Sequence, residues 1–173
     1  MASYHYLTAS LPEVRADGDM PLTYKEFLKL CQSNVSEKEY ALLESLTLDS
    51  TEGPLIEDWA KFYGMLTKEL NYQRSISLGK SCSSAYDKDG LISQVVASAL
   101  AAKNPLEAER ILLEYEFGQL DQLVGLHMFD SHVLFGYALK LKLLERLTSF
   151  EQTRGKEEFQ GLFEELQRRV YSL

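Results

Sequence analysis

The sequence predicts an all-α protein, built as an irregular bundle of about six or seven helices. Leucine and aromatic residues recur every three or four positions along nearly every apolar stretch, which is the period of one helix face. Runs of valine, isoleucine and threonine, which favour strands, are few. No segment repeats at a period of roughly 20 to 50 residues, so a bundle is favoured over a solenoid.

The first element is a short apolar segment, residues 4–11, which ends at Pro12. Its alternating aromatic residues fit a strand and its length fits two helical turns; we favour the helix. After a polar turn, Thr23 and Glu26 have the spacing of a capping box, in which each side chain binds an unpaired backbone amide. This motif predicts a helix from Tyr24 to about Gln32.

A second capping box follows at Ser36 and Glu39. Tyr40, Leu43 and Leu46 then recur on one helical face, so we expect two short helices that pair as a hairpin.

Pro54 begins a longer helix that is expected to reach about Leu78. Its apolar residues recur at steps of three and four: Leu55, Trp59, Phe62, Leu66 and Leu70. The polar, turn-rich stretch near 80–90 predicts a flexible connection. We therefore expect one domain, residues 1–173, with an N-terminal and a C-terminal helical half.

The C-terminal half opens with an alanine-rich helix over 91–102, and Asn104 and Pro105 then supply a helix cap and a proline at the first helical position. The apolar face of this next helix is predicted to comprise Ala108, Ile111, Leu112 and Tyr115. Its glutamates are expected to face water: Glu107, Glu109, Glu114 and Glu116.

Gly118 and Gly125 predict a bend or a short helix that continues through Met128. Asp130 and Ser131 can cap a further helix that runs to about Gln152, and Gly155 separates it from the last one. The apolar face of this final helix is predicted to hold Phe159, Leu162, Phe163, Leu166 and Val170.

The charge balance excludes a typical nucleic-acid-binding protein. The chain has 26 acidic and 18 basic residues, a net charge of -8, and neither half is basic, whereas binding to phosphates requires clustered lysine and arginine. From Tyr137 onward the bases, which include Arg146, are mixed with acids and are expected to lie on a solvated surface. The longest uncharged run, 91–102, is shorter than the roughly 20 residues that cross a bilayer. Because the N-terminus also lacks a secretory signal, we expect a cytoplasmic protein without direct membrane insertion.

The sequence contains no recognisable catalytic, cofactor-binding or metal-binding motif, so we expect none of these sites and no enzyme. His127 and His132 are five residues apart, whereas two ligands on one helix face are three or four apart. Cys31 and Cys82 form no Cys-x-x-Cys pair, and the glycine-rich loops that bind phosphates are absent from the sequence.

The N-terminal stretch Tyr4-His5-Tyr6-Leu7-Thr8-Ala9-Ser10-Leu11-Pro12, together with Tyr24-Lys25-Glu26-Phe27-Leu28-Lys29-Leu30-Cys31, resembles the opening of an uncharacterised bacterial family. The genes of that family lie within V-type (A/V-type) ATPase operons. The remaining helical, leucine-rich pattern is similar to the C subunit of rotary ATPases, the helical connector between the central rotor and the membrane ring. The resemblance implies a non-catalytic subunit or assembly protein, bound to V-type ATPase subunits and located in the cytoplasm or at the inner membrane through those subunits.

A protein of this kind would bind its partner through exposed aromatic and charged side chains. The candidate interface residues are Tyr4, Tyr6, Tyr72, Arg168, Arg169 and Tyr171. One alternative is a helix-bundle enzyme or small-ligand-binding protein, whose polar residues His127, Asp130, His132 and Arg74 converge in a pocket. A regulatory interaction module with no link to ATPases is a third.

Overall fold

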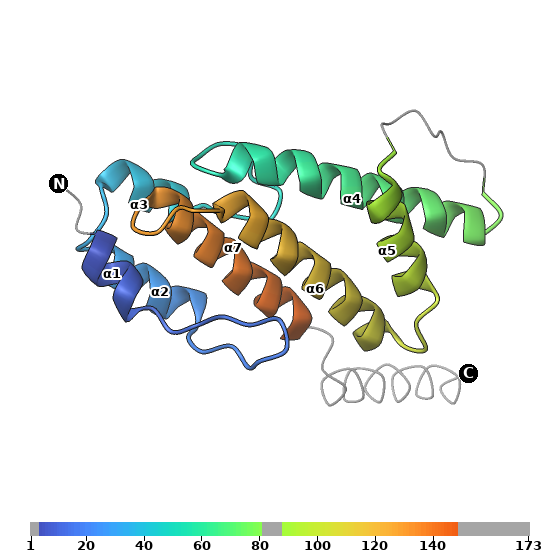
Figure 1. The fold of residues 1–173 in the computed structure, drawn as a ribbon, viewed down its shortest axis with the longest axis horizontal. Coiled ribbons are helices and arrows are strands. Elements are labelled where there is room, and N and C mark those ends of the chain that lie inside the picture. The colour runs from blue at the N-terminus through green and yellow to red at the C-terminus, as the bar shows by residue number, and fades with distance from the viewer. Residues whose placement is uncertain (1–3, 81–87, 149–173) are drawn as a thin grey trace, which may run out of the picture.

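The computed structural model describes residues 4–80 and 88–148. Within these residues the protein is entirely helical, as the sequence predicted (Figure 1). The seven helices of the described residues are α1 (Tyr4–Ser10), α2 (Tyr24–Cys31), α3 (Glu37–Glu44), α4 (Ile56–Ser77), α5 (Gly90–Leu100), α6 (Pro105–Val124) and α7 (Ser131–Thr148).

Helices α6 and α7 form an antiparallel hairpin at the centre of the bundle (Figure 1). α5 packs against α6 and α4 packs against α5 on one side of this hairpin, while α1, α2 and α3 contact α7 on the other. The other helices pack on either side of the α6–α7 hairpin, and the bundle is elongated as a result (Figure 1). The α6–α7 connection lies at the end of the bundle near α3, and the C-terminal end of α4 lies at the opposite end, beyond α5.

The core is apolar and contains most of the large residues that the helical periodicity placed inside. Trp59 is fully buried, its ring stacks on Tyr63 at 5.3 Å between centroids, and its indole N–H donates to the carbonyl oxygen of Leu48 at 3.1 Å. Phe27 and Phe135 are also fully buried. A single continuous core therefore joins the N-terminal helices to α7.

Local capping fixes where the helices begin. Thr23 and Ser36 each form the complete predicted capping box at the start of α2 and α3. The side chain of Asn104 caps α6 by accepting a hydrogen bond from the backbone N–H of Glu107, and Pro105 follows in the first turn. At the start of α7, the carboxylate of Asp130 accepts hydrogen bonds from two backbone amides. The helix preference for residues 4–11 is also confirmed.

Other boundaries differ from the expectations or lie beyond the described residues. α6 runs through Gly118 without interruption and ends at Gly125, so the expected bend and continuation to Met128 are wrong. Packing of α6 against both α5 and α7 outweighs the low helix propensity of one glycine. Three expectations concern residues that the structure does not describe: most of the flexible connection near 80–90, the end of α7 near Gln152 and the final helix over 159–170.

In the described helices, no stretch has the length and apolar character needed to span a bilayer.

Candidate functional site

The most exposed apolar segment of the described chain is the α6–α7 loop, residues 126–130. Gly125 has a positive φ of 54°, a conformation that glycine adopts without strain, and it turns the chain away from α6. The loop then presents Leu126, Met128 and Phe129 to solvent, with exposed fractions of 99%, 71% and 46%. Leu126 therefore contributes almost no buried area to the fold.

His127 in this loop and His132 in the first turn of α7 both lie beside Asp130. His127 Nδ1 hydrogen-bonds to Asp130 Oδ2, and His132 Nδ1 lies 3.9 Å from Asp130 Oδ1. The two imidazole rings stack with centroids 4.2 Å apart and planes at 9°. One potential ligand atom from each residue lies within 4.8 Å of the other two. The spacing argument concerns two ligands on one helix face and does not apply here, because His127 lies in the loop and His132 lies in α7.

Asp130 has two roles at this position. Its Oδ1 accepts from the backbone N–H groups of His132 at 3.0 Å and Val133 at 3.4 Å, which caps α7. Partial burial raises the pKa of Asp130, but the hydrogen bonds from His127 and the Val133 amide outweigh it and hold this pKa below its ordinary value. The carboxylate is therefore ionised at neutral pH.

Helix α1 packs beside this loop. The ring of His5 lies against Phe129, with 4.3 Å between centroids, and Tyr4 donates to Glu39 Oε1 at 2.6 Å. Burial and this hydrogen bond to a carboxylate raise the pKa of Tyr4. Tyr6, two positions further along α1, is 82% exposed.

The three predicted interface residues that the structure describes are not gathered on one surface. Tyr4 is half-buried and hydrogen-bonded to Glu39, whereas Tyr6 is exposed on α1. Tyr72 lies towards the C-terminal end of α4, at the other end of the bundle, where the ammonium group of Lys88 sits 4.2 Å from the centre of its ring (Figure 1). The remaining three, Arg168, Arg169 and Tyr171, lie outside the described residues.

The four polar residues proposed to share a pocket do not do so. His127, Asp130 and His132 come together, but they are half-exposed. Arg74 lies in the last turn of α4, at the opposite end of the bundle from the α6–α7 loop (Figure 1). The side chains at the loop therefore form a surface cluster without Arg74.

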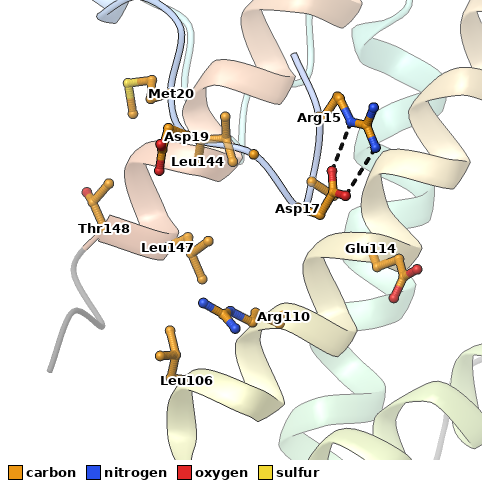
Figure 2. A pocket seen from close by; sticks show the side chains of 12 residues that line it. Arg15, Asp17, Asp19, Met20, Leu106, Arg110, Glu114, Leu144, Leu147 and Thr148 are labelled. Atoms are coloured by element: carbon orange, nitrogen blue, oxygen red, sulfur yellow. Dashed lines mark hydrogen bonds and ion pairs between the residues drawn. The ribbon is translucent and has the colours of Figure 1, made fainter.

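A cavity of about 890 Å³ lies elsewhere, between the α1–α2 loop and the paired ends of α6 and α7 (Figure 2). Leu106, Leu144 and Leu147 supply apolar walls, and Figure 2 shows Arg110 pointing into the space between the helix ends. On the loop side, Arg15 binds Asp17 through two hydrogen bonds of 3.0 and 3.1 Å. No signal in the sequence indicates this cavity, because its walls come from three segments distant in the chain.

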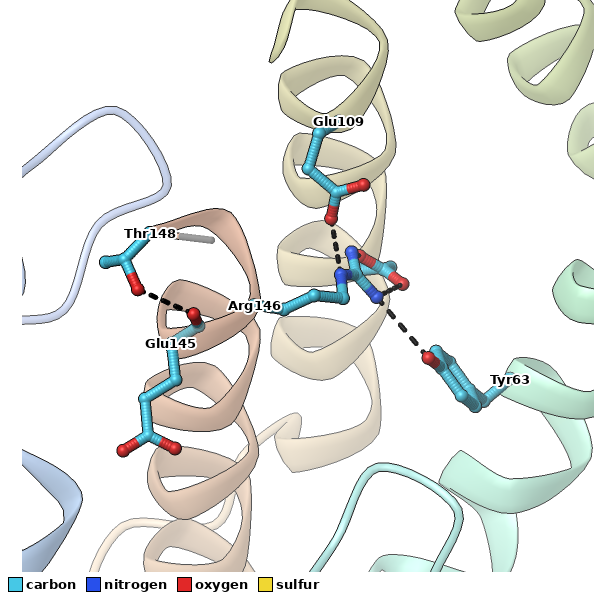
Figure 3. Close-up of polar contacts among 6 residues, drawn as sticks. Tyr63, Glu109, Glu145, Arg146 and Thr148 are labelled. Carbon is cyan, nitrogen blue, oxygen red and sulfur yellow. Dashed lines mark hydrogen bonds and ion pairs between the residues drawn. The ribbon is translucent and has the colours of Figure 1, made fainter. Parts of the chain in front are cut away.

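A buried ionic network joins α6 and α7 in the interior (Figure 3). Arg146 donates to both carboxylate oxygens of Glu116, at 2.9 Å for the Nη1 contact, and its Nε donates to Glu109. The hydroxyl of Tyr63 on α4 lies 3.4 Å from Nη1. Burial raises the pKa of Glu116, although the hydrogen bonds from Arg146 oppose this rise.

Two expectations from the sequence, about the glutamates of α6 and about Arg146, are wrong. Glu109 and Glu116 do not face water, and Arg146 is not on a solvated surface. The buried stripe of α6 is shifted by one position from the predicted apolar face, so it includes both glutamates. The guanidinium of Arg146 on the facing helix makes this burial tolerable. Since these side chains do not line the cavity of Figure 2, the network is an internal tie between helices.

No protein-family model, no curated protein and no solved structure matches the chain.

Proposed function

We propose that the protein is a non-catalytic subunit or assembly adaptor of a bacterial V-type ATPase, with a role in the central stalk like that of the C subunit. The observation that carries the proposal is the exposed apolar segment at Leu126, Met128 and Phe129. The V-type ATPase as the partner comes from the N-terminal resemblance, which covers the first 35 residues.

The loop has the properties expected of a docking element. Methionine and phenylalanine are enriched in protein interfaces, and neighbouring exposed apolar side chains are costly to leave in water unless a partner covers them. The loop is anchored on both sides, by Gly125 at the end of α6 and by the Asp130 cap of α7. A partner that binds it would therefore meet a preformed surface and would order few residues.

An adaptor in this position would work in the cytoplasm and would reach the inner membrane only through other subunits. Helix α1, which carries the exposed Tyr6 and contacts Phe129 through His5, would extend the docking surface. Exposed residues of α1, which is part of the stretch that carries the family resemblance, and the exposed loop would then belong to one interface.

The test is an affinity purification of the tagged chain from its native host in mild detergent. We expect catalytic and central-stalk ATPase subunits, identified by mass spectrometry, to co-purify with the wild-type chain. The double variant Leu126→Ser/Met128→Ser should lose most of this recovery while keeping its helical circular dichroism spectrum, because both side chains are exposed.

Leu91→Ser is the matched control. Leu91 is 66% exposed on α5, away from the loop, so this variant should recover the ATPase subunits as well as the wild type does. Recovery of no ATPase subunit by the wild-type chain would overturn the assignment of the partner. Equal losses in the loop variant and the control would overturn the assignment of the surface.

The cavity in Figure 2 favours a second candidate, a protein that binds a small amphipathic acid. Leucine walls and the guanidinium of Arg110 would accept an alkyl chain and a carboxylate. Ligand-observed NMR with medium-chain fatty acids tests this candidate. Binding that disappears in Arg110→Gln would support it, and no binding by the wild type would remove it.

A further inference from the structure

We propose that His127, Asp130 and His132 form a binding site for a divalent transition-metal ion of the zinc type. The three residues lie around the turn that joins the α6–α7 loop to α7, and one ligand atom from each lies within 4.8 Å of the others. Around a tetrahedral zinc ion, ligand distances of about 2.1 Å place neighbouring ligand atoms about 3.4 Å apart. Small side-chain rotations of half-exposed residues bring the three atoms to this separation.

The donor set selects the class of metal. Two imidazole nitrogens and one carboxylate oxygen suit Zn²⁺, Ni²⁺ or Cu²⁺, whereas Ca²⁺ and Mg²⁺ require mostly oxygen ligands. With three protein ligands, a tetrahedral ion keeps one position for water or for a group from a partner. The exposure of His127 leaves that position open to solvent.

Helix capping alone does not account for this cluster. The cap uses Asp130 Oδ1, which accepts from the amides of His132 and Val133, and it requires neither imidazole. Oδ2 instead faces His127 Nδ1, and the parallel stacking of the two rings holds His132 beside it. A metal ion bound through His127 Nδ1 would require the tautomer that carries the imidazole proton on Nε2.

Bound metal would join the middle of the exposed loop to the first turn of α7. It would restrict the conformations of Met128 and Phe129, which lie between two of the ligands in the sequence. The site does not depend on the proposed ATPase partner, because it can be measured on the isolated chain.

The test is a calorimetric titration of the untagged, EDTA-treated and dialysed full chain with ZnCl₂ at pH 7.5. We expect a single event at one equivalent, unaffected by excess Mg²⁺ or Ca²⁺. His127→Gln and His132→Gln should each weaken the affinity at least tenfold. Co²⁺ should give the visible absorption of a bound ion in the wild type and lose it in both variants.

Two further variants separate ligation from folding. Asp130→Asn keeps a side-chain oxygen that caps a helix as well as aspartate does, so the helix should stay intact while zinc affinity falls. His5→Gln changes the remaining histidine of the chain, whose ring packs against Phe129, and should keep the wild-type affinity. Cys82→Ser, at a position outside the described residues, should do the same.

The proposal fails if the wild-type chain shows no event at one equivalent. It also fails if His127→Gln and His132→Gln, with unchanged circular dichroism spectra, bind zinc as the wild type does. If His5→Gln or Cys82→Ser lost as much zinc affinity as His127→Gln and His132→Gln, the zinc would bind elsewhere, and this result would also overturn the proposal.

Discussion

Arg146 of α7 and Glu116 of α6 form a two-pronged ion pair inside the bundle, where the glutamate is 1% exposed (Figure 3). Glu109 adds a second carboxylate to the same guanidinium. Two helices that are adjacent in the sequence are thus held in register by charge as well as by apolar packing.

Replacing Arg146 by methionine should strongly destabilise the protein. The change leaves Glu116 in the interior without the guanidinium that compensates its charge, and breaking a buried pair in this way costs about 3–5 kcal/mol of unfolding free energy. Urea titration followed by the fluorescence of Trp59, the single tryptophan, measures the loss. Lys61→Ala, which breaks an exposed pair with Asp58, should leave the midpoint unchanged.

The loss in Arg146→Met should depend on pH. Burial already raises the folded-state pKa of Glu116, and removal of the cation raises it further. A carboxyl group with a raised folded-state pKa contributes most stability at low pH and loses it as the pH rises through that pKa. The stability difference between wild type and variant should therefore be smaller at pH 5 than at pH 7. A difference that stays constant would show that Glu116 is not the destabilising group.

Gly136→Ala and Gly118→Ala should have opposite effects on stability. A Cβ on Gly136 would lie 2.6 Å from Cγ2 of Val124 where α6 and α7 meet, so alanine there should destabilise the protein by about 1 kcal/mol or more. A Cβ on Gly118 meets nothing within 4 Å. Alanine at Gly118 should stabilise α6 by about 0.5–1 kcal/mol, because it restricts the unfolded chain. Thermal unfolding of both variants shows whether each substitution lowers or raises the stability of the protein.

Removing the capping hydroxyls should weaken the N-terminal helices. Thr23→Ala and Ser36→Ala each take away the acceptor for a backbone amide, at 3.3 Å in both helices, and each should cost about 0.5–2 kcal/mol. Thr67→Ala, at an exposed position inside α4, is the control and should be neutral or slightly stabilising. Chemical denaturation distinguishes the caps from the control, and equal effects would contradict a capping role.

Cys31 should be unreactive in the folded protein. The residue is fully buried, and burial raises the pKa of its thiol to about 12. In a Cys82→Ser background, iodoacetamide at pH 8 should modify Cys31 only after urea unfolds the chain. Because the folded state holds the thiol proton more tightly, this group's contribution to stability should fall as the pH rises from about 9 towards 12. Rapid labelling without urea would contradict the packing of α2.

Local sequence signals were sufficient for the fold class and for most helix starts. The capping boxes at Thr23 and Ser36, the Asn104-Pro105 pair and the Asp130 cap all act within four residues, so the sequence contains the whole interaction. Helical periodicity likewise placed Trp59 in the core without knowledge of its neighbours.

Features that depend on contacts between distant residues could not be predicted from the sequence. Glutamates at positions 109 and 116 have the appearance of a solvated face until Arg146, at least 30 residues away, is brought against them. The meeting of His127 with His132 depends on the turn at Gly125 and on where α7 begins. The acidic charge, the helical fold of the described residues and the helix starts follow from local sequence, because they depend on composition and on neighbours within one turn. Which polar residues are buried depends instead on how α6 packs on α7.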